Sequence, residues 1–195
     1  MKTDIILSGV GGQGILSVAT IIGEAAIRKG LTLKQAEVHG MSQRGGDVQS
    51  NLRLSDGPIS SDLIALGTAD MILSLEPMEA LRYLPYLSDE GWIITSSATF
   101  VNIPNYPDAG KMMEELKALP HVVALDVEAI AKENKMPKCS NVILLGAAAA
   151  FFKILDKDAL YSSIDRIFGS KGEAIVDMNH RAFMLGYEYA QNLKK

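Results

Sequence analysis

Short apolar runs of strand length alternate along the chain with segments whose apolar residues recur at helical spacing. The runs predict strands at residues 5–7, 34–38, 48–54, 71–75, 92–95 and 122–125. The helical spacing predicts helices at residues 14–29, 111–119, 127–133, 141–155, 157–168 and 173–194, and one that begins at residue 77. We therefore expect one α/β domain over residues 1–195, with three α/β/α layers around a mostly parallel, mixed sheet.

Two of these segments carry more specific patterns. In 48–54 the residues alternate between an apolar-rich face (Val48, Ser50, Leu52, Leu54) and a polar face (Gln49, Asn51, Arg53). A strand with one wetter face is typically antiparallel or at a sheet edge. The last helix carries an apolar stripe that we expect to pack on the sheet, formed by Ile175, Met178, Ala182, Leu185 and Tyr189.

Composition narrows the class of protein. The 195 residues are 48% apolar and 22% charged, as in an ordinary soluble globular domain. The net charge is −4 and the basic residues are scattered, so we expect no nucleic-acid partner. The longest apolar run, 142–152, is shorter than the roughly 20 residues of a membrane helix. The start of the chain lacks the pattern of a signal peptide, and we expect a cytoplasmic protein without a membrane partner.

Cys139 is the only cysteine in the chain. One thiol cannot form an internal disulfide, a Cys-x-x-Cys pair or a four-cysteine iron–sulfur site. His121 and His180 show no spacing of metal ligands, so we expect no metal site.

The segment from Gly9 to Gly14 fits the pattern G-x-G-x-x-G between a predicted strand and a predicted helix, as in Rossmann-like folds. Such glycines let the backbone approach a ligand closely, and the N–H groups at the helix start favour a phosphate. The same pattern also serves as a tight strand-to-helix turn that binds nothing. Both interpretations stay open at this point.

A second glycine-rich loop, residues 39–46, follows the predicted strand at 34–38. An NAD-binding fold would instead enter a helix there, with Glu37 near the place of the acid that contacts the ribose. If the two loops lie side by side, they form an anion-binding crevice with Arg44 as its cation. Otherwise the second loop is a solvated connection in which Arg44 pairs with a neighbouring acid.

Two polar groups have local predictions of their own. Glu79 and Arg82 are three residues apart on the helix that begins at residue 77, which predicts a solvated ion pair or a partner contact. Asn141 stands where it could cap the helix that contains Val142.

The loops make the chain resemble a known family. GVGGQG (9–14) followed by EVHGMSQRGGDVQSNLRL (37–54) resembles the gamma-type subunit or domain of the 2-oxoacid:ferredoxin oxidoreductases. EPMEALRYLPYL (76–87) and NVILLG (141–146) resemble the beta-subunit type of the indolepyruvate branch. The likeness covers nearly the whole chain.

The resemblance implies oxidative decarboxylation of an aryl 2-oxoacid with coenzyme A (CoA) and oxidised ferredoxin, giving an acyl-CoA, carbon dioxide and reduced ferredoxin. It also implies a larger alpha subunit as partner, which carries thiamine diphosphate, Mg²⁺ and iron–sulfur clusters and receives ferredoxin. This chain would then hold no catalytic residue, would be inactive alone and could homodimerise in isolation.

The resemblance further implies that this chain helps to receive CoA. The candidate crevice residues are Gly9, Gly11, Gly12, Gln13, Gly14, Ser42, Gln43, Arg44, Gly45 and Gly46. Two alternatives remain at this stage: a free-standing NAD(P)-linked enzyme that uses the first loop and Glu37, and an interaction module whose loops bind only protein.

Overall fold

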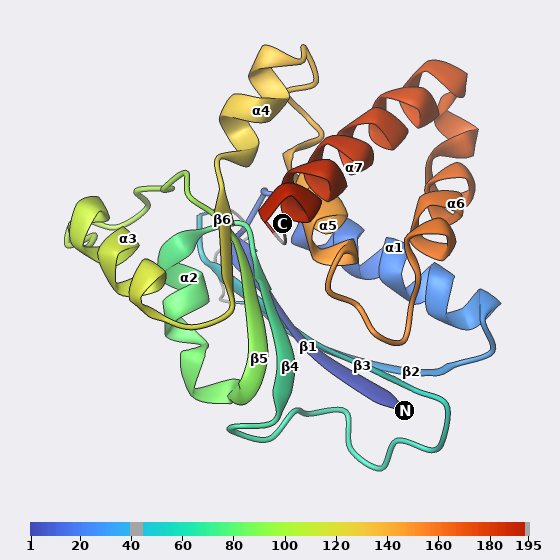
Figure 1. Ribbon diagram of the computed structural model, residues 1–195, viewed down its shortest axis with the longest axis horizontal. Coiled ribbons are helices and arrows are strands. Elements are labelled where there is room, and N and C mark those ends of the chain that lie inside the picture. Colours follow the sequence, from blue (N-terminus) through green and yellow to red (C-terminus); the bar gives the residue numbers. More distant parts are fainter. Residues whose placement is uncertain (40–44, 194–195) are drawn as a thin grey trace.

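A six-stranded mixed sheet forms the centre of the protein, with the strand order β2-β3-β1-β4-β5-β6. The computed structural model in Figure 1 describes residues 1–39 and 45–193. The strands are β1 (Lys2–Val10), β2 (Thr32–His39), β3 (Asp47–Ser55), β4 (Ala69–Ser74), β5 (Leu87–Ser96) and β6 (Val122–Leu125). Strands β1, β4, β5 and β6 are parallel, whereas β3 runs antiparallel to both β1 and β2. The predicted mixed α/β fold is confirmed.

The alternating strand, β3, is antiparallel as expected, but it lies inside the sheet and β2 forms the edge. Its polar face is covered by the chain between β3 and β4. Asn51 is buried and its Oδ1 accepts a hydrogen bond of 3.1 Å from the N–H of Ile64. Arg53 donates to the carbonyls of Ser61 and Leu63. Polar side chains on an interior strand are thus satisfied by a loop rather than by water.

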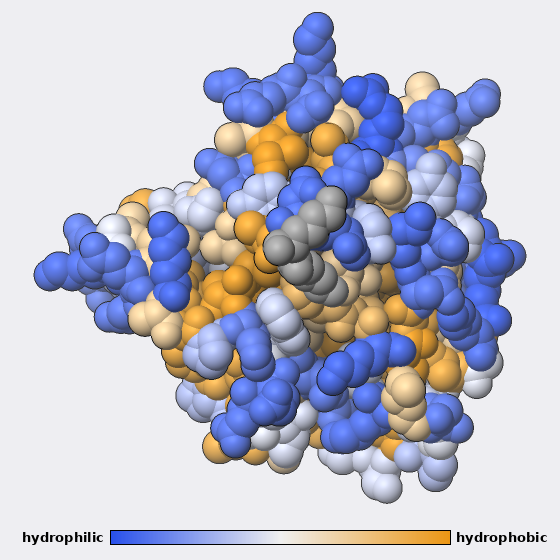
Figure 2. All heavy atoms as spheres, viewed as in Figure 1, coloured by the Kyte–Doolittle hydropathy of each residue, from blue (hydrophilic) through white to orange (hydrophobic). Residues whose placement is uncertain are grey.

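Helices cover both faces of the sheet (Figure 1). One face carries α1 (Ile15–Arg28), α5 (Ser140–Ala149), α6 (Lys157–Phe168) and α7 (Glu173–Leu193), and the other carries α2 (Pro77–Arg82) and α3 (Ala109–Ala118). The short α4 (Val127–Glu133) follows β6, and the 3₁₀ turns η1 (Leu84–Tyr86) and η2 (Gly169–Lys171) precede β5 and α7. Hydrophilic residues dominate the outer surface of α3, α4 and α6 (Figure 2). None of the helices among the described residues is both long and apolar enough to cross a membrane.

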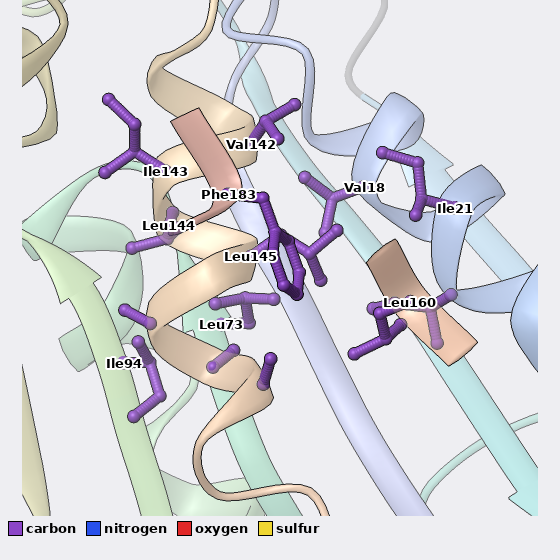
Figure 3. Close-up of a cluster of buried hydrophobic side chains, with 14 of the residues drawn as sticks. Val18, Ile21, Leu73, Ile94, Val142, Ile143, Leu144, Leu145, Leu160 and Phe183 are labelled. Atoms are coloured by element: carbon purple, nitrogen blue, oxygen red, sulfur yellow. The ribbon is translucent and has the colours of Figure 1, made fainter. Parts of the chain in front are cut away.

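The parallel strands are buried on both faces, which explains their continuous apolar sequence. Ile6, Ile72 and Ile93 contact the α2 and α3 side. Their neighbours along the strands join a larger core under the other helices. Figure 3 shows part of this core, in which residues of α1, α5, α6 and α7 meet the sheet: Val18, Ile21, Leu73, Ile94, Val142, Leu145, Leu160 and Phe183.

The C-terminal helices differ from expectation in two ways. The helix predicted at 141–155 ends at Ala149. The prediction ran too far because every residue of α5 is buried, so that its sequence has no polar face to mark an end. The last helix packs mainly along α5 rather than directly on the sheet. A Cβ added to Gly146 would lie 1.9 Å from the carbonyl oxygen of Phe183, and one added to Gly186 would lie 1.8 Å from that of Ile143. Glycine at both positions lets the two backbones touch.

Candidate functional site

The two glycine loops are hydrogen-bonded to each other at one end of the sheet. The N–H of Gly11 donates to the carbonyl of Gly46 (2.8 Å), and the N–H of Gly45 donates to the carbonyl of Gly11 (3.3 Å). This contact follows from the β1–β3 register, in which Val10 lies opposite Asp47. Gly45 and Gly46, the described end of the second loop, therefore lie beside the first loop. Ser42, Gln43 and Arg44 lie outside the described residues.

Gln13 joins the ends of two parallel strands. Its Oε1 accepts a 2.7 Å hydrogen bond from the N–H of Val10, and its Nε2 donates to the carbonyl of Leu75 (3.1 Å). A Cβ on Gly9 would lie 3.0 Å from that same Oε1, so Gly9 makes room for the clamp. The Gln13 amide thus holds the loop in shape through hydrogen bonds to backbone groups of the chain itself.

Gly12 and Gly14 have φ angles of 103° and 84°, in the left-handed region that favours glycine. Gly14 is the N-cap residue of α1 and supplies no side-chain cap, which leaves the first N–H groups of α1 without that partner. A Cβ on Gly14 would lie 2.8 Å from Asn141 Nδ2. The first loop thus exposes a helix N-terminus at a place where only glycine fits.

Asn141 ties the first loop to α5. Its Nδ2 donates to the carbonyl of Gly14 (3.0 Å), and its Oδ1 accepts from the N–H of Val142 (2.9 Å). Because α5 begins at Ser140 with Cys139 at the N-cap position, the prediction of Asn141 as the capping residue was wrong. The side chain instead fixes the starts of α1 and α5 beside each other.

A cleft of about 1130 Å³ opens beside these helix starts. Five of the ten candidate residues line it, Gly11, Gly12, Gln13 and Gly14 from the first loop and Gly45 from the second, whereas Gly9 and Gly46 do not. The other walls come from residues 98–100, the α4–α5 connection, the first turn of α5 and the segment 168–179. The residues of these walls were not predicted as part of the site, because they come from segments that are distant in the chain and carry no motif.

The irregular segment between β5 and α3 is tied to both the second glycine loop and α2. Asn102 Nδ2 donates to the carbonyl of Gly45 (2.8 Å). The fully buried carboxylate of Glu76 accepts hydrogen bonds from the N–H of Phe100 (3.3 Å), from the Tyr106 hydroxyl and from the N–H of Glu79 (3.0 Å). Burial, and then the hydrogen bond to Glu76, raise the pKa of Tyr106 above its ordinary range. These contacts position residues 98–100 at the cleft.

Glu79 and Arg82 form the predicted pair, with 2.8 Å between Arg82 Nε and Glu79 Oε2. The prediction of a solvated pair was wrong for Glu79, which is completely buried, whereas Arg82 is about half-exposed. Burial raises the pKa of Glu79, and the hydrogen bond from Arg82 opposes that rise. The helical spacing predicted the ion pair but carried no information on how deeply the Glu79 side chain is buried.

The geometry disfavours the dinucleotide alternative. Strand β3 lies between β1 and β2, so Glu37 stands two strands away from β1, about 10 Å across the sheet. Glu37 is exposed, and its Oε1 accepts a hydrogen bond from Gln35 Nε2 (2.6 Å). In a dinucleotide-binding fold the acid would follow the strand next to β1.

Cys139 is buried at the cleft, and burial raises the pKa of its thiol.

Comparison with known proteins places the chain in a family. Residues 4–189 match the family described as pyruvate ferredoxin/flavodoxin oxidoreductase. The chain is 33% identical to indolepyruvate oxidoreductase subunit IorB of Archaeoglobus fulgidus, over 97% of this chain and 96% of that protein.

Solved structures share the fold. The gamma subunit of a keto/oxoacid ferredoxin oxidoreductase from Geobacter sulfurreducens superposes with a TM-score of 0.70 at 26% identity, over 97% of this chain and 99% of that one. A 2-oxoglutarate:ferredoxin oxidoreductase from Magnetococcus marinus, solved with 2-oxoglutarate, CoA and succinyl-CoA bound, gives a TM-score of 0.76 at 22% identity. That match covers 98% of this chain and 31% of that chain. The chain belongs to the pyruvate ferredoxin/flavodoxin oxidoreductase family and is similar over nearly its whole length to the IorB subunits of indolepyruvate oxidoreductases.

Proposed function

We propose that the chain is the small subunit of an oxidoreductase that decarboxylates an aryl 2-oxoacid such as indolepyruvate, with CoA and ferredoxin as co-substrates. The near full-length similarity to IorB supports the enzyme class and the substrate. Thiamine diphosphate, Mg²⁺ and the iron–sulfur clusters would reside in a larger subunit, since one buried cysteine cannot ligate a cluster. The isolated chain would then be inactive.

The paired glycine loops are the proposed CoA-facing crevice. The observation that carries this proposal is the pair of hydrogen bonds that join Gly11 to Gly45 and Gly46, which brings the described end of the second loop beside the first loop at the start of α1. The N–H groups there and the positive end of the helix dipole favour a phosphate. In this proposal Gln13 and Asn141 shape the crevice, and Arg44 in the second loop supplies the cation.

The test is steady-state kinetics of the assembled complex. Arg44→Ala should raise the KM for CoA about tenfold or more with little change in the KM for the oxoacid, because a charge-assisted contact to phosphate is lost. Arg28→Ala is the matched control, since Arg28 lies at the opposite end of α1. An unchanged KM for CoA would remove Arg44 from this role.

A second candidate is that the loops contact only the larger subunit. The internal contacts of Gln13 and the Gly14–Asn141 contact favour it, because both use polar groups of the loop for the protein's own structure. In that case Arg44→Ala would weaken co-purification with the larger subunit and leave the KM for CoA unchanged. The same surface, when unoccupied, could support a homodimer, which sedimentation of the isolated chain would detect.

A further inference from the structure

Three lysines line the cleft outside the glycine loops. Lys135 and Lys138 lie in the α4–α5 connection and Lys171 ends η2, and all three line the cleft. Within residues 1–39 and 45–193, none of these lysines forms an ion pair. Glu128 is the one acidic residue among the described lining residues. The cleft is therefore locally cationic in a chain whose net charge is −4.

Lys135 occupies a position where its own backbone conformation is unfavourable. Its φ is 57°, and the N–H of Met136 donates to the carbonyl of Ala131 (2.7 Å), the 6→1 bond of a Schellman helix end. Glycine is the usual residue at that left-handed position, because a Cβ there costs about 1 kcal/mol. A lysine in this place weakens the helix end and directs a charge to the cleft wall.

The start of α5 adds uncharged donors to the same cleft. Ser140 lines the cleft and is 7% exposed, and its hydroxyl has no hydrogen-bond partner among the described residues. The N–H groups of Ser140 and Asn141 begin a ten-residue helix and have no intrahelical carbonyl to bond. A buried hydroxyl without a partner is unfavourable, and an incoming acceptor would satisfy it.

We propose that Lys135, Lys138, Lys171 and the first turn of α5 form a second anion subsite, which binds a phosphate monoester and is separate from the glycine loops. This inference rests on the proposed function: with CoA as the ligand, the diphosphate would bind at the glycine loops and the ribose 3′-phosphate at the lysine subsite. A cleft of about 1130 Å³ has room for a ligand of that size. Asn141, which fixes the two helix starts beside each other, would set the spacing of the two subsites.

The direct test is an NMR titration of the full-length chain with inorganic phosphate. The amide signals of Ser140, Asn141 and Lys138 should shift in a saturable way. Lys138→Gln should weaken that binding by at least about threefold, because one charged contact is lost. Lys132→Gln, an exposed change on α4 outside the cleft, should leave it unchanged. Shifts confined to the glycine loops, or equal weakening by both variants, would overturn the subsite.

Lys135→Gly separates binding from folding. Glycine relieves the left-handed strain, so the urea midpoint of the variant should rise while its affinity for phosphate falls. A variant that is more stable and binds phosphate as well as the wild type would contradict a role for Lys135.

The assembled complex distinguishes failure of this inference from failure of the proposed function. Dephospho-CoA lacks the 3′-phosphate, so its KM should exceed that of CoA about tenfold, and Lys138→Gln should narrow the gap. Equal KM values for the two compounds would overturn the subsite and leave the proposed function standing. An activity independent of CoA would overturn the proposed function, and the phosphate titration would still decide the subsite.

Discussion

Single residues decide how closely the C-terminal helices approach. Gly146 and Gly186 place the backbones of α5 and α7 in direct contact, with no room for a methyl group on either side. The atoms that would clash are backbone carbonyl oxygens, which cannot rotate away as a side chain could. These two glycines therefore set the position of α7, and with it the segment 168–179 of the cleft wall.

Gly146→Ala should destabilise the protein by about 3 kcal/mol or more, since the added carbon can be accommodated only if α7 moves. Gly169→Ala is the matched control, because its backbone is helical and nothing lies within 4 Å of the added Cβ. Urea unfolding monitored by circular dichroism measures both. A Gly146→Ala variant as stable as the control would show that α7 is not held by this contact.

The environment of Asp4 should make the stability of the protein depend on pH. The carboxylate is buried, which alone would raise its pKa, but hydrogen bonds from Arg53 and Lys2 hold that pKa below its ordinary value. A lowered pKa in the folded state contributes stability that is present above the unfolded pKa and is lost as the pH falls through the folded one. The free energy of unfolding should thus decrease between about pH 5 and pH 2.

Asp4→Asn should lower stability at neutral pH by about 2–3 kcal/mol and make this acid slope shallower, because Arg53 loses its ionised partner. Asp62→Asn, which removes an exposed pair with Lys34, should change stability by less than about 1 kcal/mol. Urea denaturation at a series of pH values tests both expectations. Equal slopes for wild type and Asp4→Asn would assign the acid dependence to other groups.

At the scale of elements, the segment between β5 and α3 is a structural part of the site. The buried Glu76 carboxylate holds it from the α2 side, and Asn102 holds the second glycine loop. A segment without regular structure is thus fixed at both ends of its contact with the cleft. Its rigidity depends on a few hydrogen bonds rather than on apolar packing.

Tyr106→Phe should therefore loosen this segment. Loss of the hydroxyl removes one donor to the Glu76 carboxylate and should cost about 1–2 kcal/mol. Hydrogen exchange of residues 98–106 should become faster, whereas Tyr86→Phe in η1 should leave it unchanged. Unaltered exchange in the Tyr106 variant would mean that the other contacts suffice.

The elements themselves were largely predictable, because continuous apolar runs and helical spacing report directly on burial. The limits of prediction show at α5 and Glu79. A helix buried on all sides has no period that marks its end, and the depth of a charged side chain depends on what the rest of the chain places over it. Among the site residues, the glycine loops were predictable because they carry a sequence motif. The three lysines of the cleft carry no motif, and they reach the same cleft as the loops only through the packing of segments that are distant in the sequence.

For the whole molecule, the similarity to IorB subunits over nearly the whole chain points to a subunit rather than to an independent enzyme. The cleft, the first glycine loop and Gly45 lie together at one end of the sheet. The chain's one cysteine is buried, so an electron path through iron–sulfur clusters would need another chain. We therefore propose that this chain makes a larger, cluster-bearing subunit competent for CoA-dependent chemistry.

Reconstitution with the larger subunit tests this role. The measurement is ferredoxin reduction with indolepyruvate as substrate, at a series of CoA concentrations, for each chain alone and for the two together. We expect CoA-dependent reduction by the complex and none by either chain alone. A larger subunit that shows the same rate and the same KM for CoA without this chain would contradict this role.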